Sequence, residues 1–132
     1  NVTLMRSEIN LGASEAAAAG TRENRPMVAQ APYVFNVGLA YASRAGGASA
    51  TLLYNRVGER IVYATAIPLP DVKELPRDVL DASLRFPLHR GVSGRVDAKN
   101  LLDVRYVIGQ GSIDREAYRG GRTFTLGLTV RP

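Results

Sequence analysis

Hydrophobic and polar residues alternate along several segments of the chain, most clearly near its C-terminus. Across residues 122–130, every second residue from Phe124 to Val130 is apolar, and threonine or glycine lies between. Side chains of a β-strand project alternately to its two faces. This spacing therefore predicts a strand with one apolar face and one polar face, as in a half-covered antiparallel sheet.

The same alternation predicts strands upstream, separated by turn-forming residues. The clearest of these spans residues 33–42, where aromatic and aliphatic residues alternate with small or polar ones. Arg6 and Glu8 blur the alternation in the first segment. The expected strands, in chain order, span residues 2–11, 33–42, 48–55, 79–86, 92–102 and 122–130.

The connections between these strands are alternately long and short. Residues 43–47 and 87–91 form short turns, so the strands on either side should be antiparallel neighbours. Residues 12–31, 59–77 and 103–121 are predicted as long loops, with a short helical turn at residues 16–19. The predicted fold is therefore an all-β, antiparallel, up-and-down sheet of about six strands, with all long loops on one rim.

The composition fits a single folded segment over residues 1–132. The chain is 45% hydrophobic, and its lack of cysteine excludes disulfides and thiolate metal sites. The net charge of +5 comes from 15 arginines and 2 lysines against 12 acidic residues. The arginines are spread along the chain instead of forming one stripe, and we expect no nucleic-acid partner.

Alternate long and short connections are typical of bacterial outer-membrane barrels, which have short periplasmic turns and long extracellular loops. No apolar run of about 18 residues is present, which excludes a transmembrane helix, whereas a barrel strand needs only about 10 residues. Tyr33 and Tyr41 share a face eight residues apart, about 26 Å along a strand. They could form aromatic girdles of a membrane-spanning band, or simply end a core-facing strand of a soluble sheet.

Five motifs resemble, in order, recurring sequences in the C-terminal part of TonB-dependent outer-membrane receptors. They are RPMVAQAPYVFNVGL (residues 25–39), LYNRVGERI (53–61), PDVKELPRDVLD (70–81), KNLLD (99–103) and YRGGRTF (118–124). The resemblance implies that the sheet is part of a transmembrane barrel in the outer membrane. It also implies TonB-dependent uptake of a scarce nutrient such as a siderophore, vitamin, sugar or peptide.

The chain departs from that family in three respects. It ends Thr129-Val130-Arg131-Pro132 without the family's usual terminal aromatic residue, and it lacks the N-terminal plug and the segment that engages TonB. Six strands also cannot close a barrel in lipid, because known single-chain barrels begin at about eight strands and open edges leave unpaired backbone groups. We therefore expect the partners of this segment to be further barrel strands, a plug domain and outer-membrane lipid.

Two groups of residues follow as candidate functional positions. The long loops would carry the ligand contacts, for which the candidates are Arg22, Arg25, Asp71, Lys73, Arg105, Asp114, Arg115 and Tyr118. The polar faces of the fourth and fifth strands would point into the lumen, where charged side chains can pair at little desolvation cost. These lumen-facing candidates are Asp81, Arg85, Arg95, Asp97 and Lys99.

No motif indicates catalysis, a cofactor or a metal, and we expect no enzymatic activity. Asp71 and Glu74 lie between prolines without the surroundings of a glycosidase pair. His89 is the only histidine, and residues 109–112 lack the lysine of a phosphate loop. The alternative to the receptor is a soluble β-sandwich that binds or adheres, because a sandwich also hides one face of each sheet.

Overall fold

The structure is a computed structural model that describes residues 1–44 and 46–131. In this described part of the chain, twelve strands form three antiparallel sheets, and one short helix accompanies them. The predicted all-β, antiparallel class is confirmed. The largest sheet has six strands, in the spatial order β1 (Val2–Leu4), β4 (Tyr33–Ala42), β5 (Ser49–Val57), β8 (Arg77–His89), β9 (Val92–Lys99) and β12 (Thr123–Val130).

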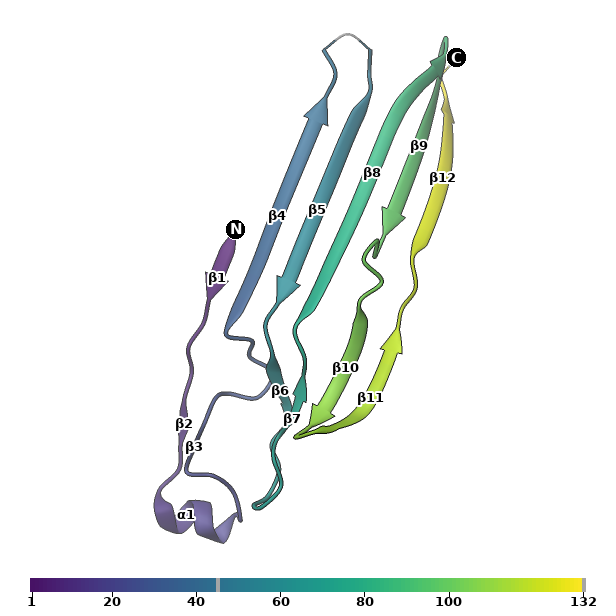
Figure 1. Ribbon diagram of the computed structural model, residues 1–132. Coiled ribbons are helices and arrows are strands. Elements are labelled where there is room, and N and C mark those ends of the chain that lie inside the picture. The colour runs from purple at the N-terminus through teal and green to yellow at the C-terminus, as the bar shows by residue number, and fades with distance from the viewer. Residues whose placement is uncertain (45, 132) are drawn as a thin grey trace.

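Two smaller sheets continue the large one at one end. The four-stranded sheet has the order β11 (Ile113–Arg119), β10 (Arg105–Gln110), β7 (Val72–Glu74) and β6 (Arg60–Tyr63). The two-stranded sheet pairs β2 (Ile9–Asn10) with β3 (Asn24–Arg25). Figure 1 shows β6, β7, β10 and β11 extending the lines of β5, β8, β9 and β12 beyond short breaks.

The segments 59–77 and 103–121, predicted as long loops, contain ordered strands. They form the β-hairpins β6–β7 and β10–β11, in which Ile61, Val72 and Val107 are buried. In the second hairpin, Gly111 has φ +60°, a conformation that glycine adopts without steric cost. The two hairpins pair with each other through β7 and β10, so this end of the sheet is ordered as well.

The first predicted loop and strand also differ from the structure. Residues 2–11 form two short strands, β1 and β2, instead of one. The predicted loop over residues 12–31 contains β3 and the helix α1 (Ala13–Ala18), whose alanines favour helix. The carboxylate of Glu15 accepts a hydrogen bond from the backbone N–H of Gly12 at 3.4 Å, which satisfies a donor at the helix start.

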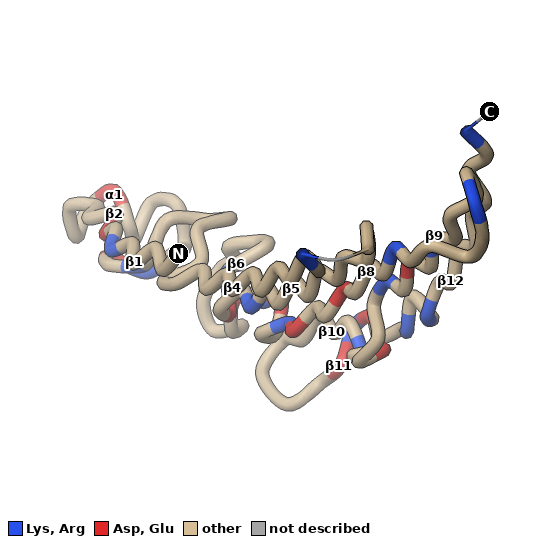
Figure 2. The backbone as a smooth tube through the Cα atoms, turned by 90° about the horizontal axis from the view of Figure 1, so that it is seen from above, with Lys and Arg blue, Asp and Glu red and all other residues tan. Residues whose placement is uncertain are grey.

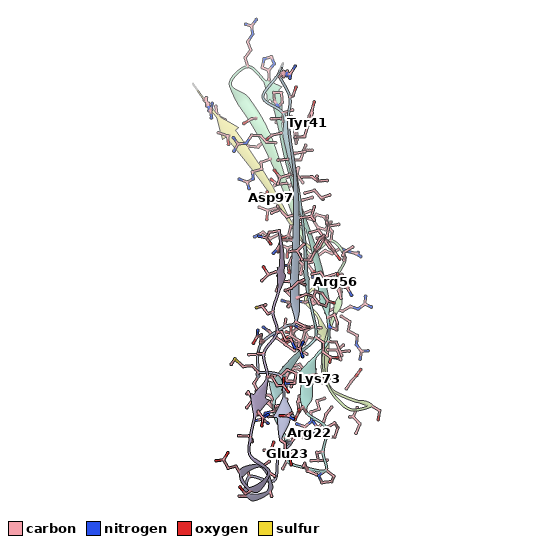
Figure 3. All side chains as sticks on the ribbon, turned by 90° about the vertical axis from the view of Figure 1, so that its left-hand side faces the viewer. Arg22, Glu23, Tyr41, Arg56, Lys73 and Asp97 are labelled. Carbon is pink, nitrogen blue, oxygen red and sulfur yellow. The ribbon has the colours of Figure 1, made fainter. Side chains whose placement is uncertain are left out.

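The register of the large sheet separates the alternating residues into two faces. Phe35, Leu39 and Tyr41 lie opposite Arg56, Leu52 and Ala50 on β5, and the pairing continues across β8, β9 and β12. Directly opposed residues of an antiparallel pair share a face. Figure 3, which views the sheet along its surface, shows side chains projecting from both sides, with Tyr41 and Asp97 on opposite sides.

The sheet is one layer thick. Within residues 1–44 and 46–131, the extensive contacts of each strand are with its hydrogen-bonded neighbours, and Figure 2 shows one curved layer from above. The two larger sheets lie end to end, so the described residues do not form a β-sandwich. A compact protein of 14.2 kDa exposes about 6,800 Å². This chain exposes 9271 Å², about 2,500 Å² more, and 21 of its large apolar side chains are exposed.

Few apolar side chains are buried, and three of them lie in the hairpin region. Ile61, Val72 and Val107 are less than 9% exposed and come from β6, β7 and β10. The small core therefore stabilises the hairpins and leaves the six-stranded sheet without cover. The helix of the described region is too short and too polar to cross a membrane.

Candidate functional site

The first candidate surface is the apolar face of the six-stranded sheet, defined as the side that carries Leu39 and Leu126. It is apolar in consecutive rows that cross five strands. One row contains Leu39, Leu52, Ala82, Ala98 and Phe124, and the next contains Tyr41, Ala50, Leu84, Val96 and Leu126. Leu39 is 63% exposed and Leu126 is 79% exposed. An apolar area of this extent is far larger than single exposed residues, and such areas mark contacts with lipid or protein.

The opposite surface, the polar face, carries all five lumen-facing candidates. One row contains Ala40, Thr51, Ser83, Asp97 and Thr125, and Asp81, Arg85, Arg95 and Lys99 occupy the same side of neighbouring rows. Arg95 forms a salt bridge with Asp97 at 2.8 Å (Nε to Oδ2). Asp81 accepts a hydrogen bond from the backbone N–H of Asn100 at 2.9 Å. The charges of the polar face are therefore partly neutralised within the sheet.

Asparagine side chains extend the polar face toward the N-terminus. The side-chain amide of Asn55 donates to Asn36 at 2.6 Å, and that of Asn36 donates to Asn1 at 2.9 Å. This ladder crosses from β5 over β4 to the first residue of the chain. It stabilises the first strand on the polar face, where amides can pair without loss of apolar contact.

A polar cluster on the apolar side, the boundary cluster, ends the apolar face toward the hairpins. It consists of Tyr33, Tyr54, Arg56 and Asp78. Arg56 Nη1 donates to both carboxylate oxygens of Asp78, at 3.1 and 3.0 Å, and the Tyr54 hydroxyl donates to the same carboxylate. Arg56 Nε lies 3.4 Å from the Tyr33 hydroxyl. The apolar face thus passes abruptly into paired charges and phenol groups.

The second candidate surface is the loop-side groove, which lies between residues 5–8, residues 22–32 and the β6–β7 hairpin. Its volume is about 620 Å³, and its lining is rich in charged side chains. Four predicted ligand-contacting residues line it together, although they are up to about 50 positions apart in sequence. These residues are Arg22, Arg25, Asp71 and Lys73.

Ion pairs fix much of the groove wall. Arg22 Nη1 lies 3.0 Å from Asp71 Oδ2, and Lys73 Nζ lies 2.7 Å from Glu59 Oε1. The side chain of Asp71 is only 6% exposed, and it also accepts a hydrogen bond from the backbone N–H of Thr65 at 2.9 Å. Asp71 therefore holds the wall in place and is not a free acid.

Two guanidinium groups of the groove have no carboxylate partner among the residues that the structure describes. They belong to Arg6 and Arg25. Arg25 donates from Nη1 to the Thr21 hydroxyl at 3.2 Å, but its buried Nε has no partner in the described region. A buried donor without a partner is costly. The groove can offer the positive charge of these two guanidinium groups to an anionic or hydroxyl-rich ligand.

The other four ligand-contacting candidates lie on β10–β11 and do not line the groove. Arg105 and Asp114 form a salt bridge at 3.1 Å, and the ring of Tyr118 packs on Tyr106 with centroids 4.8 Å apart. Arg115 lies exposed on β11. The sequence-based set is thus divided between two places, and only its first half forms a concave surface.

Residues that the sequence analysis did not select complete the hairpin region. Arg60 Nη2 lies 2.6 Å from Glu74 Oε2, and the pKa of Tyr106 is raised by burial and then by the nearby Glu74 carboxylate. Arg60 and Glu74 were missed because their segment was taken as a loop, although directly opposed residues of a hairpin pair. Asp71 and Glu74 each form a salt bridge with an arginine, Asp71 with Arg22 and Glu74 with Arg60.

The described residues contain no group of three or more histidine, cysteine or acidic side chains that could hold a metal ion. Comparison of the chain with protein-family models, with curated proteins and with solved structures gives no significant match. Functional inference therefore depends on the two faces of the sheet, the boundary cluster and the groove.

Proposed function

We propose that this chain forms wall strands and outer hairpins of a bacterial outer-membrane receptor for TonB-dependent nutrient uptake. Its apolar face would contact lipid, and its polar face would line the lumen against a plug domain. The observation that carries the proposal is the apolar face: rows of apolar side chains cross five strands without cover, while charged and hydroxyl side chains occupy the reverse.

The height of the apolar face supports a membrane location. On β4 the face runs from Tyr33 to Tyr41, which is about 26 Å along the strand and about 20 Å if the strand tilts by about 40°. The outward apolar band of outer-membrane barrels is about 25 Å tall and is bordered by aromatic residues. The boundary cluster lies where such a band would meet lipid headgroups.

The edges and the two ends of the sheet support the barrel assignment. β1 and β12 each have a hydrogen-bonded neighbour on one side only, and edges in a bilayer must be paired. Further strands of the receptor would pair them. The short turns lie at one end and the β6–β7 and β10–β11 hairpins at the other (Figure 1), as periplasmic turns and extracellular loops do in barrels.

In this arrangement the loop-side groove would take part in ligand recognition. Its unpaired guanidinium groups at Arg6 and Arg25 favour a ligand with carboxylate, phosphate or hydroxyl groups. Siderophores, sugars and peptides all carry such groups. TonB would act through a receptor segment other than the strands described above.

The absence of cysteine allows a direct test with single-cysteine variants. Leu39→Cys and Leu126→Cys lie on the apolar face, and Ala40→Cys and Thr125→Cys are matched controls on adjacent positions of the opposite face. Each variant is labelled with a polarity-sensitive fluorophore and incorporated into phosphatidylcholine vesicles.

Fluorophores at positions 39 and 126 are expected to shift to shorter wavelength and to be quenched by lipids brominated on their acyl chains. Those at positions 40 and 125 are expected to do neither. Failure of the chain to float with vesicles, or equal quenching on both faces, would contradict the proposal. Burial of positions 39 and 126 without lipid quenching would indicate a protein cover, as in a soluble binding module.

A further inference from the structure

The net positive charge of the chain is concentrated at the short-turn end of the sheet. The segments 39–52, 84–96 and 127–132 contain five arginines and no acidic residue. Removing these five from the 17 basic residues leaves 12, which equals the number of acidic residues in the chain. The rest of the chain is therefore neutral. The five arginines are Arg44, Arg85, Arg90, Arg95 and Arg131.

Three of these arginines lie at the tip of this end and form the basic rim, defined as Arg44, Arg90 and Arg131. Arg44 lies in the turn between β4 and β5, and Arg90 lies in the turn between β8 and β9. The backbone N–H of Arg131 donates to the carbonyl of Gly91 at 2.7 Å, which holds Arg131 beside the turn that contains Arg90. Figure 1 shows both turns and the C-terminus at the same end of the strands.

No carboxylate neutralises the basic rim. All three side chains are exposed, and none forms a salt bridge within residues 1–44 and 46–131. The nearest acidic residue along β9 is Asp97, which pairs with Arg95 and lies about 16 Å beyond the strand's first residue. At physiological salt the screening length is about 8 Å, so acidic residues near the hairpins do not offset the rim.

The basic rim directly borders the apolar face. Tyr41, Phe86 and Val130 are the last residues of that face before the turns and the C-terminus, and Tyr41 is 66% and Val130 70% exposed. An uncovered apolar face that ends in unpaired arginines matches the order of groups in a lipid leaflet, where acyl chains lie next to phosphates. Arginine donates two parallel hydrogen bonds to a phosphate and remains charged at every physiological pH.

We propose that the basic rim binds anionic lipid headgroups of the leaflet that the short turns reach. This inference depends on the proposed membrane location and adds a lipid preference to it. In the receptor orientation, this leaflet is the periplasmic one. The lipid class is an anionic phospholipid with an exposed phosphate, such as phosphatidylglycerol, and the rim fixes how far the wall strands enter the bilayer.

The test compares two triple variants with the same net charge. Arg44→Gln, Arg90→Gln and Arg131→Gln remove the rim, whereas Arg105→Gln, Arg115→Gln and Arg119→Gln remove three exposed arginines from the β10–β11 hairpin. The unaltered chain and both variants are incubated with vesicles of phosphatidylcholine alone or with about one third phosphatidylglycerol, and partition coefficients are measured by flotation.

The unaltered chain and the hairpin variant are expected to partition more strongly into the anionic vesicles. Each basic residue near an anionic surface contributes about a fivefold preference, so loss of three corresponds to about a hundredfold. The rim variant is expected to lose most of this preference while it still partitions into phosphatidylcholine. The preference should also fall at 0.5 M salt, and millimolar inorganic phosphate should not remove it.

Three results would overturn the proposal. They are an anionic preference that survives in the rim variant, a preference that falls equally in the hairpin variant, and rim-dependent binding of poly-glutamate in solution without any vesicle preference. The last would assign the rim to an acidic protein segment. If the unaltered chain binds neither kind of vesicle, both the proposed membrane location and the proposed lipid binding by the basic rim are refuted. If it binds both kinds equally, only the lipid binding by the basic rim is refuted.

Discussion

An arginine placed in the apolar face tests whether that face meets lipid. Leu39 is two residues from Tyr41 and four from Phe35, whose row contains Arg56 and Asp78 of the boundary cluster, which is about 7 and 13 Å along β4. It is also 63% exposed, so a long side chain meets the surroundings of the sheet and not a packed core. Leu39→Arg therefore places a charge inside the apolar face, away from the boundary cluster.

The expected cost follows from depth. An arginine on the lipid face of a barrel costs about 2–4 kcal/mol at the bilayer midplane and about 0–1 kcal/mol near the interface. Leu39→Arg should lower the free energy of unfolding by the larger amount. Val37→Arg should cost less, about 1–2 kcal/mol, because Val37 lies directly opposite Tyr54, whose hydroxyl donates to Asp78, and the added guanidinium group can pair with that carboxylate. Ala40→Arg is the control, because it faces the polar side and should change stability by less than about 0.5 kcal/mol.

The assay is guanidinium-induced unfolding of the chain in phosphatidylcholine vesicles, followed by tyrosine fluorescence and far-ultraviolet circular dichroism. The denaturant midpoint should be highest for the control, lower for Val37→Arg and lowest for Leu39→Arg. An unchanged midpoint for Leu39→Arg would mean that the apolar face meets water, and an equal loss for Ala40→Arg would mean that both faces are covered. Either result would refute the depth argument.

Three further outcomes are expected. A Cβ atom added at Gly94 would lie 2.8 Å from the ring of Phe86 on the opposite strand, so Gly94→Ala should cost about 1–3 kcal/mol, and adding Phe86→Leu should restore part of it in the same unfolding assay. The pKa of Tyr106 is raised in the folded state, so the protonated phenol contributes to the stability of the fold. This contribution is complete below the ordinary tyrosine pKa near 10 and is lost as the pH rises through the folded-state pKa. Absorbance titration at 295 nm should show the raised value, and Glu74→Gln should lower it. Asp71→Ala leaves a guanidinium group and a backbone N–H without their acceptor, and it should cost about 2–3 kcal/mol and increase proteolysis in the turn that joins β6 to β7.

Local alternation was sufficient to predict five strands of the six-stranded sheet and the residues on each face, whereas the predicted first strand, residues 2–11, is divided between β1 and β2. β4 was predicted with its observed bounds, and β12 within one residue. The ends of the other strands were less accurate. Residues 87–91 were predicted as a turn because they begin with a proline and end with a glycine. In the structure β8 continues through Pro87 to His89, and Pro87 pairs with Ser93 next to a register shift. Strand ends depend on the partner strand as well as on the residue type.

The hairpin region and the groove could be predicted only in part. Residues 105–110 and 113–119 have a glycine turn between them, but consecutive apolar residues in the first segment and consecutive charged residues in the second hide any strand alternation. The pairing of β7 with β10 joins segments more than 30 residues apart and has no local signal. The salt bridge between Arg22 and Asp71 also has no local signal, because the fold places the segment that contains Arg22 next to the distant β6–β7 hairpin.

The sequence by itself determined that this protein forms antiparallel strands with one apolar and one polar face, because side-chain direction in a strand depends only on every second position. The tertiary structure decided what those faces meet. It left the apolar face of Leu39 and Leu126 without a second layer, ended it at the pair Arg56–Asp78, and gathered Arg44, Arg90 and Arg131 at one tip. Whether the apolar face is covered, where it ends and where the arginines gather all depend on strand register and on which distant segments become neighbours. None of these properties can be read from local alternation.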